Sequence, residues 1–165
     1  MPKHWYAVYT KSRAEKMVDK LLNEKGIDRY LPLQRVLRQW SDRKKWVEEP
    51  LIRSYIFVNI ANDREYLNVL QTDGVVKFVT FAGKAAKIPE KQIDNIKLLL
   101  ASEEDLEVTP EKFEPGMDIE VHAGPLKGLE GSLIELKGKN RVKVELEAIG
   151  QSILVEIPAV YLRKK

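Results

Sequence analysis

The side chains of this 165-residue chain that could do chemistry are aromatic and basic rather than nucleophilic. The chain has no cysteine, which excludes a disulfide framework, a thiolate metal site and a cysteine nucleophile. His4 and His122 are its only histidines, and they lie in opposite halves of the sequence, so no histidine-based dyad or metal cluster follows. Residues 124–131 are rich in glycine but lack the Gly-Lys-Ser/Thr ending of a phosphate-binding loop. We therefore expect no enzyme, no catalytic residue, no cofactor and no metal.

Aromatic residues concentrate in two predicted strands, residues 4–9 and 51–60. With a period of two, one face of each strand is mainly aliphatic and the other carries most of the aromatic rings. The aromatic faces hold Trp5, Tyr9, Tyr55 and Phe57. If helices cover the aliphatic face, the aromatic face is an apolar surface suited to a partner helix. Periodicity equally allows a sheet covered on both sides, with these rings in an ordinary core.

Basic residues concentrate in the first 46 positions, which hold 12 basic and 5 acidic side chains, although the whole chain carries only +3. The candidate nucleic-acid contacts among them are Lys11, Arg13, Lys16, Arg43, Lys44 and Lys45. The last three lie in a basic segment, residues 34–46, that also contains Trp40 and Trp46. Cations beside aromatic rings suit a single-stranded nucleic acid, through phosphate attraction and base stacking. The alternative is a solvated charged face with two packing tryptophans.

The elements that must position these residues indicate an α+β domain, an antiparallel sheet with flanking helices. A helix is predicted from a capping box, Ser12-Arg13-Ala14-Glu15, to a stop at Gly26. A short helix capped by Asp63 and a third helix opening at Pro89 follow, with strands between them. This first domain is predicted to span residues 1–101.

Residues 101–122 hold eight acidic side chains and one lysine. This composition, with Pro110, predicts a flexible acidic linker at residues 102–114; the alternative is a frayed helix end at residues 103–107. Five short strands separated by glycine-containing turns then predict a small SH3-like barrel over residues 115–165. The Glu- and Leu-rich stretch 133–146 leaves a helical alternative open.

Both predicted domains resemble those of one family. The second resembles a KOW domain, on the motif Gly116-x-x-Ile119-x-Val121-x-x-Gly124-Pro125-Leu126-Lys127-Gly128-x-x-Gly131. The first resembles the NusG N-terminal domain, on Trp5-Tyr6-Ala7-Val8-Tyr9-Thr10, Ser12-Arg13-Ala14-Glu15, Leu31-Pro32-Leu33, Tyr55-Ile56-Phe57-Val58, Gly74-Val75-Val76-Lys77-Phe78-Val79 and Ile88-Pro89. Their order and spacing identify the chain as similar to NusG-family transcription factors.

This resemblance implies a transcription elongation or antitermination factor that binds bacterial RNA polymerase and suppresses pausing or termination. Family members seat the clamp helices of the largest polymerase subunit in a hydrophobic depression, and the matching positions are Trp5, Tyr9, Ile52, Tyr55, Phe57 and Phe81. In specialised members the basic face touches the non-template DNA strand, for which Lys11 and Arg13 are the best candidates. The resemblance also implies a ribosomal protein or Rho as the partner of the KOW domain.

One departure from the family pattern is Arg53-Ser54, where many members have Pro-Gly or Pro-Asn before the tyrosine of the central strand. Together with the basic segment it favours a specialised antiterminator of polysaccharide-synthesis operons. The alternatives are a general NusG factor acting genome-wide and a KOW-type ribosomal or RNA-binding protein. No apolar run approaches the length of a membrane span, and the first residues lack a signal-peptide hydrophobic region, so we expect a cytoplasmic protein without membrane contact. We also expect a monomer.

Overall fold

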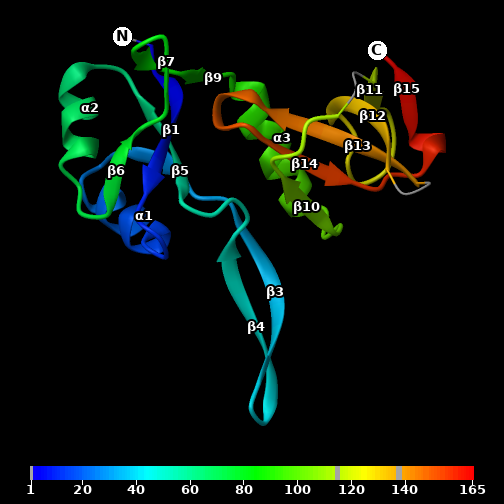
Figure 1. Cartoon of the computed structure of the whole chain (residues 1–165), viewed down its shortest axis with the longest axis horizontal. Helices are drawn as coiled ribbons and strands as arrows, with labels where there is room; N and C mark the ends of the chain where they lie inside the picture. Colours follow the sequence, from blue (N-terminus) through cyan, green and yellow to red (C-terminus); the bar gives the residue numbers. More distant parts are fainter. Residues whose placement is uncertain (1, 114–115, 137–138) are drawn as a thin grey trace. The chain divides into compact units, whose positions relative to one another are not determined.

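The computed structural model describes residues 2–113, 116–136 and 139–165, and it confirms the expected α+β class. Within these residues three α-helices accompany antiparallel sheets (Figure 1). The chain divides into two compact units, Met1–Glu90 and Lys91–Lys165. The third helix therefore groups with the second unit, whereas the domain boundary predicted after residue 101 places it in the first.

The first unit is built on a sheet of five short strands. In chain order its elements are β1 (His4–Thr10), α1 (Glu15–Glu24), β2 (Asp28–Tyr30), β3 (Leu33–Trp40), β4 (Arg43–Pro50), β5 (Tyr55–Ile60), α2 (Asp63–Leu70), β6 (Val75–Phe78), β7 (Thr80–Phe81), β8 (Lys84–Ala85) and β9 (Lys87–Ile88). The strand order is β2-β5-β1-β6, and β9 also pairs with β1. Because side chains alternate along a strand, β1 contributes residues to both faces of the sheet.

Helices α1 and α2 cover one face of this sheet. In α1, Val18 and Leu22 lie one turn apart and are fully buried, and α2 contributes Val69. The sheet contributes Val8 of β1 and Ile56 of β5, which are directly opposite each other. Full burial of an aliphatic side chain of this size is worth about 1.5–3 kcal/mol, so a one-residue slip of β1 would be costly. This core therefore determines which side chains of β1 and β5 lie on the other face.

Two helix starts differ from the sequence predictions. Helix α1 begins after Ala14 without a side-chain cap, and Glu15 does not complete a capping box. The Glu15 carboxylate instead accepts a hydrogen bond of 2.8 Å from the backbone N–H of Ser54. Helix α2 is capped by Asn62 rather than Asp63, since the Asn62 side-chain oxygen accepts from a backbone N–H of the first turn at 2.9 Å. The first difference reflects a tertiary contact that a local pattern does not reveal.

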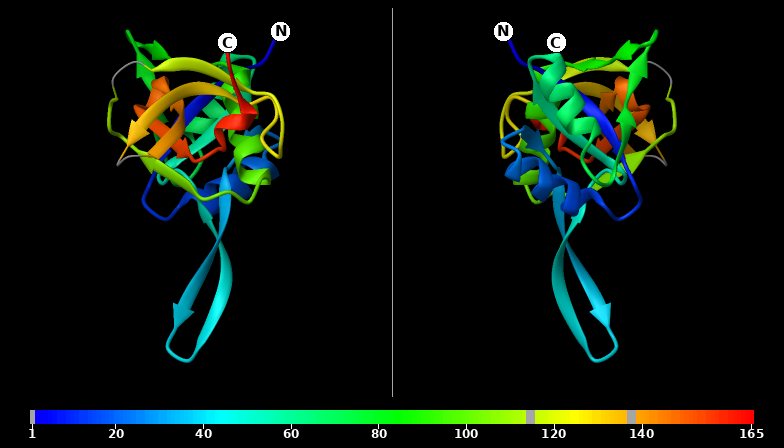
Figure 2. Two further views of the ribbon diagram at one scale, coloured as in Figure 1. Left: turned by 90° about the vertical axis from the view of Figure 1, so that its right-hand side faces the viewer. Right: turned by 90° about the vertical axis from the view of Figure 1, so that its left-hand side faces the viewer.

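The predicted basic segment forms a β-hairpin. Strands β3 and β4 pair along their whole length, from Leu33 opposite Pro50 to Trp40 opposite Arg43, around a two-residue turn. Both views of Figure 2 show this hairpin as a ribbon that extends away from the sheet of the first unit. The hairpin forms its own two-stranded sheet, so most of its side chains remain exposed.

The second unit is an antiparallel sheet accompanied by one helix. Its elements are α3 (Glu90–Ala101), β10 (Leu106–Thr109), β11 (Met117–Val121), β12 (Glu130–Leu136), β13 (Lys139–Leu146), β14 (Gln151–Val155) and β15 (Leu162–Lys164), with short 3-10 turns at Glu147–Ile149 and Ala159–Tyr161. The strand order is β10-β14-β13-β12-β11-β15. The five predicted barrel strands are present and enclose buried aliphatic side chains, among them Ile119, Leu129, Val144 and Ile153. Residues 133–136 and 139–146 are strand, not the helix that their composition left open.

The acidic segment differs from the expected linker. Leu106–Thr109 pair with β14 as an added strand, so this stretch belongs to the sheet. Arg141 donates a hydrogen bond of 2.8 Å to Glu107, which compensates part of the acidic charge. The residues of the predicted linker and turns that lie outside the described part are Glu114, Pro115, Lys137 and Gly138. In the part that is described, no helix combines the length and the apolar character needed to cross a membrane.

Candidate functional site

Four aromatic residues of β1 and β5 lie on the sheet face opposite helices α1 and α2, whereas Tyr6 of β1 packs against the core beneath these helices. Directly opposed residues of an antiparallel pair point to the same face. The opposed pairs on this face are Trp5 with Asn59, Ala7 with Phe57, and Tyr9 with Tyr55. The grouping of the four aromatic residues by alternation therefore agrees with the structure.

Exposure divides this aromatic face into two parts. Phe57 is completely buried, and only 9% of Trp5 is exposed, so both are packing residues in this structure. Tyr9 and Tyr55, at the end of β1 and the start of β5, are half-buried. The accessible part of the face is therefore the end formed by the two tyrosines.

Tyr9 and Tyr55 form a ring pair with centroids 4.8 Å apart and planes inclined by 41°. Lys77 of β6, opposite Tyr9 in the register, places its ammonium group 5.5 Å from the Tyr9 ring centroid. Burial, followed by a side-chain hydrogen bond and the charge of Tyr9, raises the pKa of Tyr55 to about 12. The Tyr55 phenol is thus neutral at physiological pH, and the pair offers apolar ring surface together with a hydrogen-bonding hydroxyl group.

Two other predicted polymerase contacts lie outside the β1–β5 row. Ile52 lies in the segment before β5 and is only 3% exposed, so it belongs to the core. Phe81 lies on β7, in a separate small hairpin with β8, and is 81% exposed. Among the large apolar side chains of the described residues, Phe81 has the highest exposed fraction, which suits a contact with a partner.

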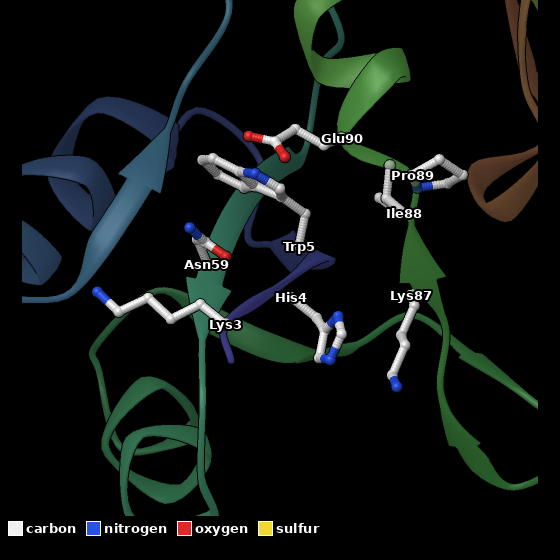
Figure 3. Close-up of a pocket in the computed structure, with 8 residues that line it drawn as sticks. All are labelled: Lys3, His4, Trp5, Asn59, Lys87, Ile88, Pro89 and Glu90. Atoms are coloured by element: carbon white, nitrogen blue, oxygen red, sulfur yellow. The ribbon is translucent and has the colours of Figure 1, made fainter. Parts of the chain in front are cut away.

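A pocket of about 280 Å³ lies beside Trp5 (Figure 3). Its lining consists of Lys3, His4, Trp5, Asn59, Lys87, Ile88, Pro89 and Glu90. Figure 3 shows the Trp5 ring near Asn59 and Glu90. The His4 imidazole lies on the other side of Trp5 from Glu90, so His4 and Glu90 do not form an acid–base pair. The eight lining residues include no hydroxyl or thiol nucleophile. In the described residues, no cluster of three histidine or acidic side chains is placed to hold a metal ion.

The β3–β4 hairpin has two faces of different composition. Residues opposite each other share a face, so the register assigns Arg38, Trp40, Arg43, Lys45 and Glu49 to one face and Arg35, Leu37, Lys44, Trp46 and Glu48 to the other. We call these the Trp40 face and the Trp46 face. Of the three predicted contacts on this hairpin, Arg43 and Lys45 lie together on the Trp40 face, whereas Lys44 lies on the Trp46 face.

A cation lies over each hairpin tryptophan. The Lys45 ammonium group is 5.1 Å from the Trp40 ring centroid, and the Arg35 guanidinium is 5.1 Å from the Trp46 ring centroid. Both rings are about half exposed. An exposed cation–π contact is worth about 0.5–1 kcal/mol and keeps positive charge beside an accessible ring. Each face can therefore offer a base-stacking surface next to a phosphate-binding group.

The remaining predicted nucleic-acid contacts follow β1. Lys11 and Arg13 lie in the loop between β1 and α1, Lys16 lies in the first turn of α1, and all three are exposed. The loop is anchored because the backbone N–H of Lys11 donates a 2.8 Å hydrogen bond to the carbonyl oxygen of Gly74. These three cations are thus displayed from an ordered segment.

Glu49 is an acidic residue on the Trp40 face, among the cations of the hairpin. Its carboxylate accepts two hydrogen bonds from Arg38, at 2.7 Å from Nε and 2.5 Å from Nη2. These hydrogen bonds, with the positive charges of Arg38, Arg53 and Lys16, hold the pKa of Glu49 below its ordinary value. Glu49 is therefore held by Arg38 and also feels the positive charges of Arg53 and Lys16. Residues 38 and 49 share a face only because of the hairpin register. A turn predicted at residues 41–42 would have fixed this register from the sequence.

Comparisons with known protein families and sequences agree with one another. Residues 3–97 match the family model described as "Transcription termination factor nusG". The chain is 27% identical over 166 residues to the transcription termination/antitermination protein NusG of Rickettsia typhi, covering 94% of this chain and 86% of that protein. It is 28% identical over 171 residues to the protein of the same name from Staphylococcus aureus strain Mu50, covering 94% and 92%.

A solved structure, described as "Domain interaction in Thermotoga maritima NusG", is similar with a TM-score of 0.56. The identity is 22%, and the match covers 98% of this chain and 97% of that one. At this level of identity the likeness shows the fold.

Proposed function

The chain belongs to the NusG family, and from this membership we propose that it binds bacterial RNA polymerase through its first unit and suppresses pausing or termination. Its relatives are named transcription termination/antitermination proteins. The proposed partner is the pair of clamp helices of the largest polymerase subunit.

The observation that carries the polymerase contact is the half-buried Tyr9–Tyr55 pair. A helix laid across this end of the sheet would cover the exposed parts of both rings, and aromatic residues are common anchors of such interfaces. Phe81 supplies a second exposed ring in the same unit. The buried Trp5, Ile52 and Phe57 support the surface rather than contact the partner.

Binding of the full chain to core RNA polymerase, measured by titration, tests this proposal. An isolated clamp-helix fragment should compete for the same site. Failure to bind core polymerase, or binding that the fragment does not reduce, would contradict the proposed interface.

We also propose that the exposed cations contact the non-template DNA strand while the protein is bound to polymerase. The cation–π pairs of the hairpin and the anchored loop residues Lys11 and Arg13 support this proposal. Site-specific crosslinking between the protein and the single-stranded region of a transcription bubble is the direct test.

The Arg53-Ser54 departure from the family pattern is weak support for a specialised factor. Ser54 has a φ of 66°, in the left-handed region that glycine and asparagine favour, so the turn forms in spite of the replacement. The basic hairpin still favours an operon-specific antiterminator, and a general NusG role agrees equally well with the relatives. Chromatin occupancy decides between them: enrichment in a few long operons supports the specialist, and genome-wide spread supports the general factor.

For the second unit we propose the KOW domain, residues 115–165, as the site that recruits a further partner, a ribosomal protein or Rho. The family motif from Gly116 to Gly131 supports this assignment. We propose that the protein acts as a cytoplasmic monomer. Titration of the full chain with purified Rho and, separately, with ribosomal proteins tests the choice of partner.

A further inference from the structure

The carboxylate of Glu49 fills the guanidinium fork of Arg38 at the base of the β3–β4 hairpin. Both hydrogen bonds are short, 2.7 Å and 2.5 Å, yet the side chains of Arg38 and Glu49 keep 47% and 28% of their surface exposed. An exposed ion pair of this kind is weak, because water competes with both partners. The fork is therefore occupied but accessible.

Glu49 shares the Trp40 face with several hairpin cations. Lys45 lies directly opposite Arg38 in the register, and Arg43 lies closer to the turn on the same face. The positive charges of Arg53 and Lys16, outside the hairpin, also act on the Glu49 carboxylate and help to lower its pKa. A negative group is thus held among the cations of the hairpin.

We infer that the Arg38 fork is a phosphate site for single-stranded DNA, and that Glu49 occupies this site until a backbone phosphate displaces its carboxylate. A backbone phosphodiester offers the fork the same bidentate pair of oxygens and the same single negative charge as a carboxylate. A DNA strand also brings further phosphates to the neighbouring cations. The bound strand also contacts Arg43 and Lys45, which share the Trp40 face with Arg38. This inference rests on the proposed contact with the non-template strand and adds Arg38 to its binding residues.

Glu49 then lowers the affinity of the free protein for nucleic acid. Each binding event must break the Arg38–Glu49 hydrogen bonds and place a phosphate close to a carboxylate. The neighbouring Glu48 provides a matched comparison, because it carries the same charge but lies on the Trp46 face, opposite Arg35. Neutralising either residue changes the net charge equally, and only Glu49 occupies the Arg38 fork.

The test measures binding of a fluorescent oligothymidylate to the full-length protein by anisotropy at low salt. Glu49→Gln should bind about two- to five-fold more tightly than wild type, because it removes the competing charge of an exposed pair. Glu48→Gln should tighten binding by less than about 1.5-fold, the effect expected from net charge alone. In Glu49→Gln combined with Arg38→Ala, the gain should disappear. Thermal unfolding of each variant verifies that the hairpin change leaves the fold intact.

The outcomes separate this inference from the proposed function. Equal affinities for Glu49→Gln and Glu48→Gln, with binding still reduced by Lys11→Ala and Arg13→Ala, would overturn the phosphate site and leave the DNA contact in place. No binding by wild type or any variant, together with no crosslink to the strand in a transcription bubble, would overturn both. A larger gain on a DNA duplex than on the single strand would overturn the assignment to single-stranded DNA.

Discussion

Tyr9 and Tyr55 are directly opposed residues of β1 and β5, 46 positions apart in the chain, and their ring centroids lie 4.8 Å apart on the sheet face opposite the two covering helices. This pair stays half-buried, whereas Phe57, two residues further along β5, is completely buried. Substitution of the accessible Tyr55 should therefore affect partner binding, whereas substitution of the buried Phe57 should affect stability.

Loss of the Tyr55 ring should weaken polymerase binding while the fold is retained. Tyr55→Ala removes a partly exposed aromatic anchor, which should cost about 2 kcal/mol, or about 30-fold in affinity for core polymerase. Tyr55→Phe is the matched control: it keeps the ring and should bind nearly as well as wild type. Binding of Tyr55→Ala with wild-type affinity would remove this residue from the interface.

Loss of the Phe57 ring should act on stability instead. Phe57→Ala leaves a cavity at a completely buried position and should lower the free energy of unfolding by about 3–5 kcal/mol. Phe81→Ala truncates the same side chain where it is 81% exposed, and should change stability by less than about 0.5 kcal/mol. Chemical denaturation measures both, and similar losses in the two variants would contradict the burial that separates them.

The phenols of Tyr30 and Tyr55 should ionise well above pH 10. Burial raises the pKa of Tyr30 to about 12, and burial with the Tyr9 hydrogen bond raises the pKa of Tyr55 to about 12. Both values exceed 10.0, so the folded state keeps these protons longer than the unfolded state; their stabilising contribution is complete below pH 10 and is lost as the pH rises toward about 12.

Ultraviolet absorbance of tyrosinate measures this titration. Tyr55→Phe should remove one of the two phenols that ionise near pH 12. An unchanged absorbance step near pH 12 in that variant would show that the Tyr55 hydroxyl is not protected.

Glycine at position 54 should stabilise the protein. Ser54 has a φ of 66° and is held by its carbonyl oxygen, which accepts from Thr10, and by its N–H, which donates to Glu15. Ser54→Gly should raise the free energy of unfolding by up to about 1 kcal/mol, since relief of a strain of about 1–2 kcal/mol exceeds the entropic cost of glycine. Ser12→Gly introduces the same change at a residue without positive φ and should give no gain. A larger gain at position 12 would show that backbone strain is not the cause.

Removal of the loop cations should flatten the salt dependence of DNA binding. Lys11→Ala with Arg13→Ala removes two phosphate contacts, and each contact to a single strand contributes about 0.7 to the slope of log affinity against log salt. We expect the slope to fall by about 1.4, with polymerase affinity largely retained. Lys20→Ala with Lys84→Ala is the control of equal charge, since both lysines are exposed and lie outside the β3–β4 hairpin and the β1–α1 loop. Equal slopes for the two double variants would exclude the loop as a specific contact.

Alternation along β1 and β5 was sufficient to predict which aromatic residues share a face. The period of two is a local property of extended backbone, and the Val, Ile and Tyr of these strands mark it clearly. The barrel strands could also be predicted from the sequence, since glycine-containing turns separate them. The family motifs, read from the same residues, led to the family that the model match over residues 3–97 shows.

Features that depend on contacts between residues distant in the sequence could not be predicted from local patterns. The acidic composition around Leu106–Thr109 predicts a linker, because so short an edge strand has no clear sequence pattern. Only its pairing with β14 shows that it is a strand. Glu15 looked like half of a capping box because its contact with Ser54 spans 39 positions.

The functional surface shows the same division. The sequence determined that cations and tryptophans occur together in residues 34–46, since this is a matter of composition. Only the tertiary structure decided that Lys44 points away from Arg43 and Lys45, that Phe57 is buried while Tyr55 is accessible, and that Glu49 fills the Arg38 fork. The reason is physical: residue type sets which interactions are available, but strand register and burial determine which of them form.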